Sequence, residues 1–115
     1  MKVKIYHNPR WGKSRNSVRI LEEKQLDYEV IEYLKTPPTA DDLRKILKIL
    51  NLRPNQIVRK GEKEFLENNL SGIEEDDMKM IDAIAKYPKI MERPIIINGN
   101  KGVIGRPPEN ILDII

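Results

Sequence analysis

The segment Tyr6–Arg15 gathers the residue types that could do chemistry at one place. It reads Tyr-His-Asn-Pro-Arg-Trp-Gly-Lys-Ser-Arg, so a histidine, a serine and several basic side chains lie close together in the sequence. This pattern is typical of a strand end, a tight basic loop and a helix start, and that geometry points backbone N–H groups at an anion. The surroundings suit a reactive nucleophile, yet the loop tip is Trp11, and an indole is neither nucleophile, base nor metal ligand.

The composition excludes several kinds of chemistry. The chain has no cysteine, which removes disulfides, zinc–thiolate sites, iron–sulfur clusters and thiol catalysis. Its single histidine, His7, cannot build a histidine-rich metal site, so we expect no metal. The net charge of +3 is mild, and basic residues are interleaved with acidic ones almost throughout, with local basic excesses near the N-terminus and in the middle of the chain. Anionic ligands are therefore permitted, whereas nothing in the charge pattern calls for nucleic acid.

The elements that must position this loop follow from the apolar pattern. Residues 3–6 alternate as a short strand that ends at the Asn8–Pro9 turn signal. A helix is predicted over 14–25, with Ser14 as its N-cap, and a second strand over 28–33. A strand, a helix and a strand of these lengths make a βαβ unit, whose crossover should be right-handed if the strands are parallel.

The rest of the chain adds helices and then a hairpin. Thr39 is predicted to cap a helix whose apolar face holds Leu43, Ile46, Leu47 and Leu50. Residues 51–61 are predicted as loop or short helix, 64–70 as a short helix, 76–87 as a helix, 95–97 and 101–104 as strands, and the segment after Pro107 as a last short helix. Asn98–Asn100 is a hairpin turn signal, and Pro94, just before the apolar strand, is a candidate for a cis peptide bond.

Chain length and hydropathy bound the organisation of the protein. At 115 residues the sequence predicts a single domain over residues 1–115, with no internal repeat or linker. No apolar run approaches the roughly 20 residues of a membrane helix. The chain passes from Met1 straight into a strand pattern with no apolar signal region, so we expect a cytoplasmic protein.

Several ordered landmarks carry a resemblance to a known family. They are Ile5-Tyr6-His7-Asn8-Pro9, Lys13-Ser14-Arg15-Asn16, Tyr33-Leu34 with Pro37-Pro38, Val58-Arg59-Lys60, Glu92-Arg93-Pro94-Ile95 and Gly105-Arg106-Pro107. In this order they resemble the glutaredoxin-dependent arsenate reductases, and the match is closest to the short, arsenate-reductase-related branch. The resemblance implies an α/β, thioredoxin-like three-layer fold, with a small mixed four-stranded sheet, helices on both faces and an inserted helical segment.

The resemblance also implies a reaction and the residues that perform it. In the family a cysteine at the loop tip attacks arsenate, and glutathione and glutaredoxin resolve the adduct to release arsenite; no bound cofactor is implied. Carried onto this sequence, the nucleophile position is Trp11, with His7 beside it. The implied anion-binding residues are Gly12, Lys13, Ser14, Arg15, Arg59, Arg93 and Arg106.

Without a thiol the family's reaction should be absent, so we expect a redox-inactive member that keeps a site for arsenate, phosphate or sulfate. An alternative is a non-enzymatic interaction or regulatory module that uses the Trp11 loop, because the family also includes regulators that bind RNA polymerase; glutaredoxin is another candidate partner. Trp11 itself has three interpretations: a residue that fills or covers the anion pocket, an exposed anchor for a partner, or an isolated change in this chain. Nucleic acid and membrane are not expected as partners.

Overall fold

The computed structural model describes residues 2–115, except for the side chain of Lys13. The chain divides into two compact units. One combines residues up to Thr36 with Arg93–Ile115, and the other is Pro37–Glu92. Compact units of one chain can fold together or separately, so the single domain expected from chain length stays a prediction. Among the described residues no helix is long and apolar enough to cross a membrane.

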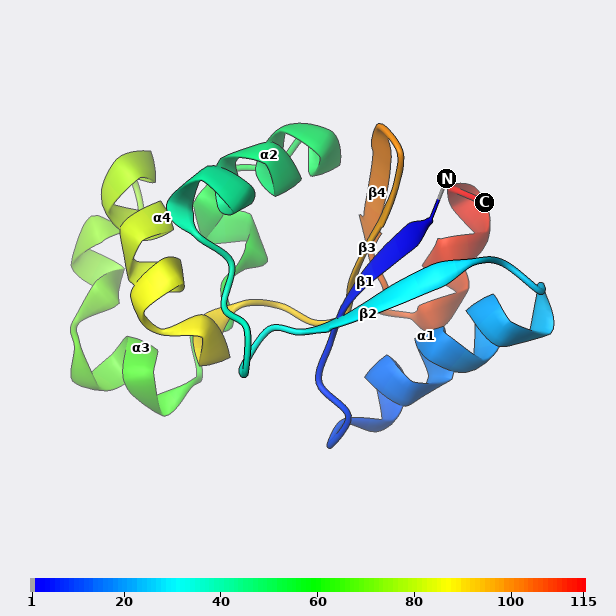
Figure 1. Ribbon diagram of the computed structural model, residues 1–115. Coiled ribbons are helices and arrows are strands. Elements are labelled where there is room, and N and C mark those ends of the chain that lie inside the picture. The colour runs from blue at the N-terminus through cyan, green and yellow to red at the C-terminus, as the bar shows by residue number, and fades with distance from the viewer. Residues whose placement is uncertain (1) are drawn as a thin grey trace. The chain divides into compact units, whose positions relative to one another are not determined.

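The first unit is built on a mixed four-stranded sheet in the order β2-β1-β3-β4 (Figure 1). Its strands are β1 (Val3–His7), β2 (Tyr28–Glu32), β3 (Ile95–Asn98) and β4 (Lys101–Ile104). β1 pairs with β2 in parallel and with β3 antiparallel, and β3 pairs antiparallel with β4. The predicted βαβ unit and C-terminal hairpin are therefore confirmed, with strand ends shifted by one residue.

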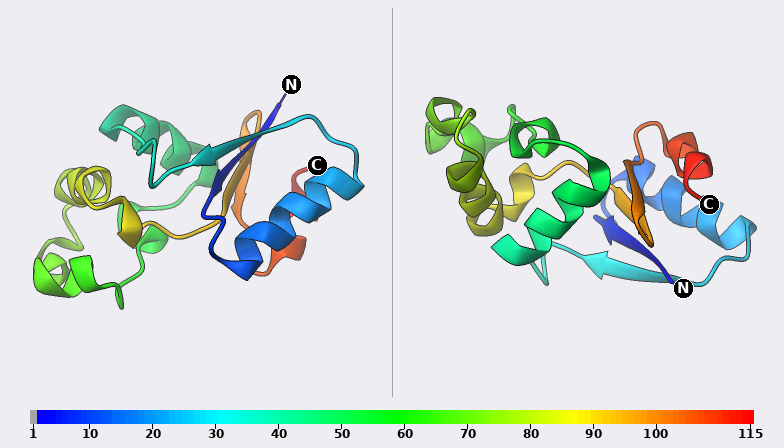
Figure 2. Two further views of the ribbon diagram at one scale, coloured as in Figure 1. Left: turned by 60° about the horizontal axis from the view of Figure 1, so that its bottom comes forward. Right: turned by 90° about the horizontal axis from the view of Figure 1, so that it is seen from above.

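One face of this sheet is covered by two helices, α1 (Gly12–Glu23) and the 3₁₀ helix η4 (Pro108–Asp113), which lie side by side (Figure 2). The core beneath them combines residues from β1, β3, α1 and η4 with one residue just after η4: Val3, Ile5, Leu21, Ile96, Ile111 and Ile114. Burial of a large aliphatic side chain stabilises by about 1.5–3 kcal/mol. This core holds β1 and α1 against each other, and so fixes the loop between them.

The turn residues of the β3–β4 hairpin explain its tight connection. Asn98 pairs with Lys101 in the β3–β4 register, which leaves a two-residue turn of Gly99 and Asn100. Gly99 has a φ of 64°, a conformation that glycine adopts without a steric penalty.

The second unit is helical. It contains α2 (Ala40–Leu50), η1 (Pro54–Ile57), α3 (Lys63–Glu67), η2 (Leu70–Ile73), α4 (Asp77–Lys86) and η3 (Pro88–Ile90). Thr39 caps α2 as predicted: its hydroxyl accepts a hydrogen bond from Asp42 N, and the Asp42 carboxylate accepts one from Thr39 N. The inserted helical segment expected from the sequence is confirmed.

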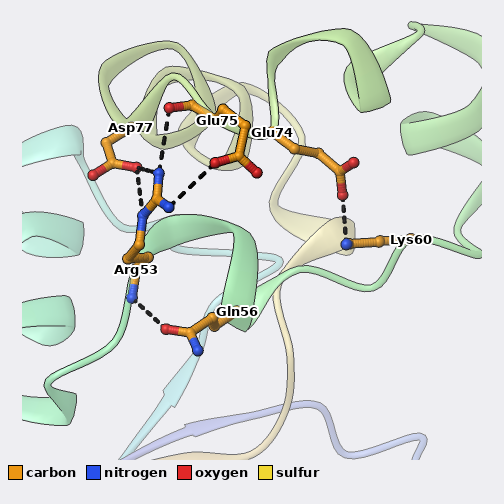
Figure 3. Close-up of polar contacts among 6 residues, drawn as sticks. All are labelled: Arg53, Gln56, Lys60, Glu74, Glu75 and Asp77. Atoms are coloured by element: carbon orange, nitrogen blue, oxygen red, sulfur yellow. Dashed lines mark hydrogen bonds and ion pairs between the residues drawn. The ribbon is translucent and has the colours of Figure 1, made fainter.

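An arginine joins two parts of this helical unit. Arg53, just before η1, donates from Nη2 to Asp77 Oδ1 at 3.0 Å and from Nη1 to Glu75 Oε2 at 3.3 Å, while Lys60 pairs with Glu74 nearby (Figure 3). These contacts tie η1 and the segment after it to the start of α4. The Arg53 contacts are solvent-exposed, so each contributes little by itself and weakens with added salt.

Candidate functional site

The loop between β1 and α1 is a tight turn organised by Asn8. Trp11 N donates to the Asn8 carbonyl oxygen at 3.1 Å, and Arg10 N donates to the Asn8 side-chain oxygen at 3.1 Å. Asn8 is buried, and an asparagine in this position folds the backbone back on itself through its own side chain. Sequence reasoning recognised Asn8–Pro9 only as a turn signal and did not count Asn8 among the site residues.

The helix after this loop begins earlier than predicted. α1 starts at Gly12, and Trp11 is its N-cap, with φ −108° and ψ 130° and no capping hydrogen bond from its side chain. The first intrahelical bond runs from Arg15 N to the Trp11 carbonyl oxygen at 3.1 Å. The first N–H groups of an α-helix lack intrahelical acceptors, so this end of α1 carries the partial positive charge that favours anions.

The prediction that Ser14 is the N-cap is therefore wrong. Ser14 lies inside the first turn of α1 and is fully buried. Its hydroxyl oxygen accepts a hydrogen bond from Asn8 N at 3.1 Å and lies 2.9 Å from His7 Nδ1. The serine hydroxyl connects the helix to the strand end and the loop, because the buried Asn8 N–H and the imidazole need partners.

His7 ends β1 and is buried beside Ser14. Burial lowers the pKa of its imidazole below the usual value for histidine. The carboxylate of Glu32 acts in the opposite direction, and Arg15 lowers the pKa further. Burial of the His7 side chain thus favours its neutral form. Since Ser14 already accepts from Asn8, its own hydrogen is available to donate to His7 Nδ1.

Arg15 folds back over the loop. Its Nη1 donates to the Pro9 carbonyl oxygen at 3.0 Å, and its Nη2 lies 3.7 Å from where a Cβ at Gly12 would stand. The side chain is exposed, and it adds positive charge beside the start of α1. Gly12 and Lys13 occupy the first turn of α1; the Lys13 side chain lies outside the described part of the structure.

Trp11 and Arg93 meet although they are far apart in the sequence. The Arg93 guanidinium carbon is 4.0 Å from the centroid of the Trp11 ring, which is a cation–π contact. Arg93 is buried, with 4% of its surface exposed, whereas 48% of Trp11 is exposed. The indole therefore contacts the buried guanidinium while about half of its own surface faces solvent.

Arg106 directly follows Gly105, whose backbone is hydrogen-bonded to Pro94, the residue after Arg93. Gly105 N donates to the Pro94 carbonyl oxygen at 2.8 Å, and a Cβ at Gly105 would lie 2.8 Å from Ile96 Cδ1 and 2.9 Å from Ser17 Oγ. A side chain at position 105 would therefore force these neighbouring side chains to shift. The Arg93–Pro94 and Arg106–Pro107 peptide bonds are cis, and the Arg106 side chain is exposed.

Arg59 belongs to the helical unit, where two carboxylates surround it. Its Nε lies 3.2 Å from Glu62 Oε1, its Nη1 lies 3.7 Å from Glu92 Oε1, and its backbone N donates to the Ile90 carbonyl oxygen. Within its unit the positive charge of Arg59 is thus balanced by acidic side chains. Its assignment to an anion site stays a prediction.

The arrangement in the first unit offers positive charge and N–H donors but no thiol. His7 and Ser14 are buried and hydrogen-bonded to each other, and the Ser14 hydroxyl also accepts from Asn8 N, which suits a structural role. Among residues 2–115 no group of acidic or histidine side chains could hold a metal ion. What the loop offers chemically is attraction for an anion at a helix N-terminus flanked by arginines.

Comparisons with known proteins match nearly the whole chain. The model of the ArsC family matches residues 6–114. The chain is similar to the Escherichia coli (strain K12) protein YfgD, at 43% identity over 98% of this chain and 96% of the relative. An arsenate reductase of Neisseria meningitidis serogroup A is 38% identical over 95% of this chain and 94% of the relative. The solved arsenate reductase from Vibrio cholerae matches with a TM-score of 0.95 and 36% identity, over 100% of this chain and 98% of the other. These matches confirm the thioredoxin-like α/β fold class.

Proposed function

Because this chain belongs to the ArsC family, we propose that it binds a tetrahedral oxyanion at the loop between β1 and α1 and does not reduce arsenate through a thiol. One observation carries the proposal: the loop tip, where the family resemblance expects the nucleophilic cysteine, is Trp11, and the chain contains no cysteine. Arsenate, phosphate and sulfate are the anions of suitable shape. The expected compartment is the cytoplasm.

The missing thiol removes the reaction at its first step. The family's route forms a bond between a cysteine sulfur and the arsenic of arsenate, and two electrons from thiols then reduce arsenic(V) to arsenic(III). An indole forms no such bond under these conditions, since it is not a nucleophile of this kind. Glutathione and glutaredoxin then have no protein-bound adduct to resolve, so we propose no reductant partner for the native chain.

Anion binding is supported by the charges around the loop. Arg15 lies over the loop, Arg93 contacts Trp11, and Arg106 follows a segment bonded to Pro94. A guanidinium is permanently charged and offers donors in a fork that matches oxyanions. The start of α1 adds backbone N–H groups with no side-chain cap from Trp11.

A paired assay tests the redox part of the proposal. Native protein and Trp11→Cys are compared for arsenite formation with glutathione and glutaredoxin. We expect no arsenite above the protein-free rate from the native chain, and formation by Trp11→Cys. Reduction by the native chain would show that another group supplies the electrons, and would refute the proposal.

A binding measurement tests the other part. Trp11 is the only tryptophan, so its emission reports directly on the loop. Titration with arsenate, phosphate or sulfate should change this emission, and calorimetry should give the same affinity. If calorimetry detects no heat at millimolar anion and the emission stays constant, the oxyanion site does not exist.

The exposed half of Trp11 favours a second candidate function, a protein-interaction module. A large ring at a loop tip, next to the exposed Arg10, has the character of an interface anchor. Purified glutaredoxin is a defined partner to try: binding would shift the indole N–H resonance of Trp11, and calorimetry, which needs no indole, should detect no binding to Trp11→Ala. An unchanged indole resonance at saturating glutaredoxin would exclude this partner.

A further inference from the structure

The contact between Trp11 and Arg93 combines an exposed side chain with a buried one. The ring centroid and the guanidinium carbon are 4.0 Å apart, 48% of Trp11 is exposed, and only 4% of Arg93 is. The Arg93 nitrogens Nε and Nη2 are both buried from solvent. An anion that binds a guanidinium must approach its nitrogens to about 2.7–2.9 Å. With these atoms buried, an anion that arrives from solvent cannot reach them.

We infer that Trp11 is a cover over Arg93, and that an oxyanion binds this guanidinium only when the indole moves aside. The inference rests on the proposed oxyanion site and adds to it: the residue at the nucleophile position controls access to the anion-binding arginine. Trp11 then acts on the anion through Arg93 and makes no bond to the anion itself.

The movement required is confined to a side chain. The Trp11 backbone is held on both sides, since its N donates to the Asn8 carbonyl oxygen and its carbonyl oxygen accepts from Arg15 N. Its side chain provides no capping bond to α1, so a change of rotamer leaves the helix start intact. Side chains that are half exposed change rotamer on fast timescales. The cover therefore opens without unfolding the loop.

The cost of opening sets the expected effect on affinity. On this inference the indole leaves the guanidinium before the anion binds and the cation–π contact is lost, and contacts of this type correspond to roughly a 5- to 30-fold change in an equilibrium constant. Removing the ring removes that cost. Trp11→Ala should therefore bind the oxyanion roughly 5- to 30-fold more tightly than the native chain.

The test is calorimetry with sulfate and with phosphate on the native chain, Trp11→Ala, Trp11→Phe and Arg93→Ala. Circular dichroism melts establish that each variant is folded. Leu112→Ala is the matched control, because Leu112 is also 48% exposed and apolar in the same unit. We expect affinity to rise from native to Trp11→Phe to Trp11→Ala, and Leu112→Ala to equal the native chain. In the double variant Trp11→Ala/Arg93→Ala the gain should vanish. Native Trp11 emission should shift to longer wavelength as the anion binds.

Other outcomes overturn the inference in distinguishable ways. Equal affinity of the native chain and Trp11→Ala would leave the oxyanion site standing and refute the cover. Weaker binding by Trp11→Ala would likewise refute it, because the ring would then be part of the binding surface. If neither protein binds either anion, the cover and the proposed function fail together.

Discussion

The buried bond between Ser14 and the loop gives the sharpest prediction for stability. Ser14→Ala deletes the hydroxyl oxygen that accepts a hydrogen bond from Asn8 N at 3.1 Å and lies 2.9 Å from His7 Nδ1. All three residues are buried, so water cannot easily replace the lost hydroxyl. Each buried polar group left without a partner costs about 1–3 kcal/mol.

The expected magnitude follows from these contacts. Two groups lose a partner, and the gain in helix propensity from serine to alanine returns only about 0.5 kcal/mol. With a cost of about 1.5 kcal/mol for each group, toward the lower end of that range, the net loss in the free energy of unfolding should be about 2.5 kcal/mol. For a chain of this size, that corresponds to a drop of roughly 10 °C in Tm.

Urea denaturation followed by circular dichroism measures this loss. Asn16→Ala is the matched control, because Asn16 lies in the same helix and is exposed. Asn16→Ala should be neutral or slightly stabilising. If Ser14→Ala unfolds at the same urea concentration as Asn16→Ala, the hydroxyl does not stabilise the loop, and the reasoning from burial and hydrogen bonding is wrong.

Two further predictions concern the same unit. His7 is the only histidine, so its ring resonances can be followed by NMR without ambiguity, and they should titrate with a pKa below 6.5 because burial disfavours the imidazolium. The pKa of His7 is lower in the folded state than in the unfolded state, so the unfolded state binds the proton more readily. The contribution of His7 to the free energy of unfolding should therefore be constant above about pH 6.5 and should fall as the pH drops from there toward the folded pKa. A folded pKa at or above 6.5 would contradict the burial argument. Gly105→Ala should lower the free energy of unfolding by about 1–3 kcal/mol in urea denaturation, because its Cβ would lie 2.8 Å from Ile96 Cδ1. Gly72→Ala is the control, because a Cβ there meets no atom within 4 Å. Equal effects of the two substitutions would show that the core around Ile96 adapts.

Local signals made most of the fold predictable. The helix capped by Thr39 was predictable because a capping threonine and a periodic apolar face act within a few residues of each other. The hairpin at Gly99 was predictable for the same reason. Both features depend on neighbours in the sequence, and neither needs the rest of the chain.

The site was only partly predictable, because its contacts join distant segments. Ser14 has the residue type of an N-cap, and only the buried partners His7 and Asn8 decide that it lies inside the helix instead. The pairing of Trp11 with Arg93 has no periodicity that a sequence pattern could reveal. The close packing at Gly105 comes from side chains on β3 and α1, which meet only in the folded unit.

The residues of the loop region fall into two groups, one whose contacts stabilise the fold and one suited to binding a ligand. The bonds among His7, Asn8 and Ser14 satisfy buried polar groups, so selection for stability alone would retain them in a chain without a thiol. The Arg93 guanidinium is different, because a permanently charged fork of N–H donors matches the shape of an oxyanion. Arg93 beneath Trp11 is therefore the feature whose presence argues for a ligand, and the response of Arg93 variants to oxyanions decides whether this site still binds one.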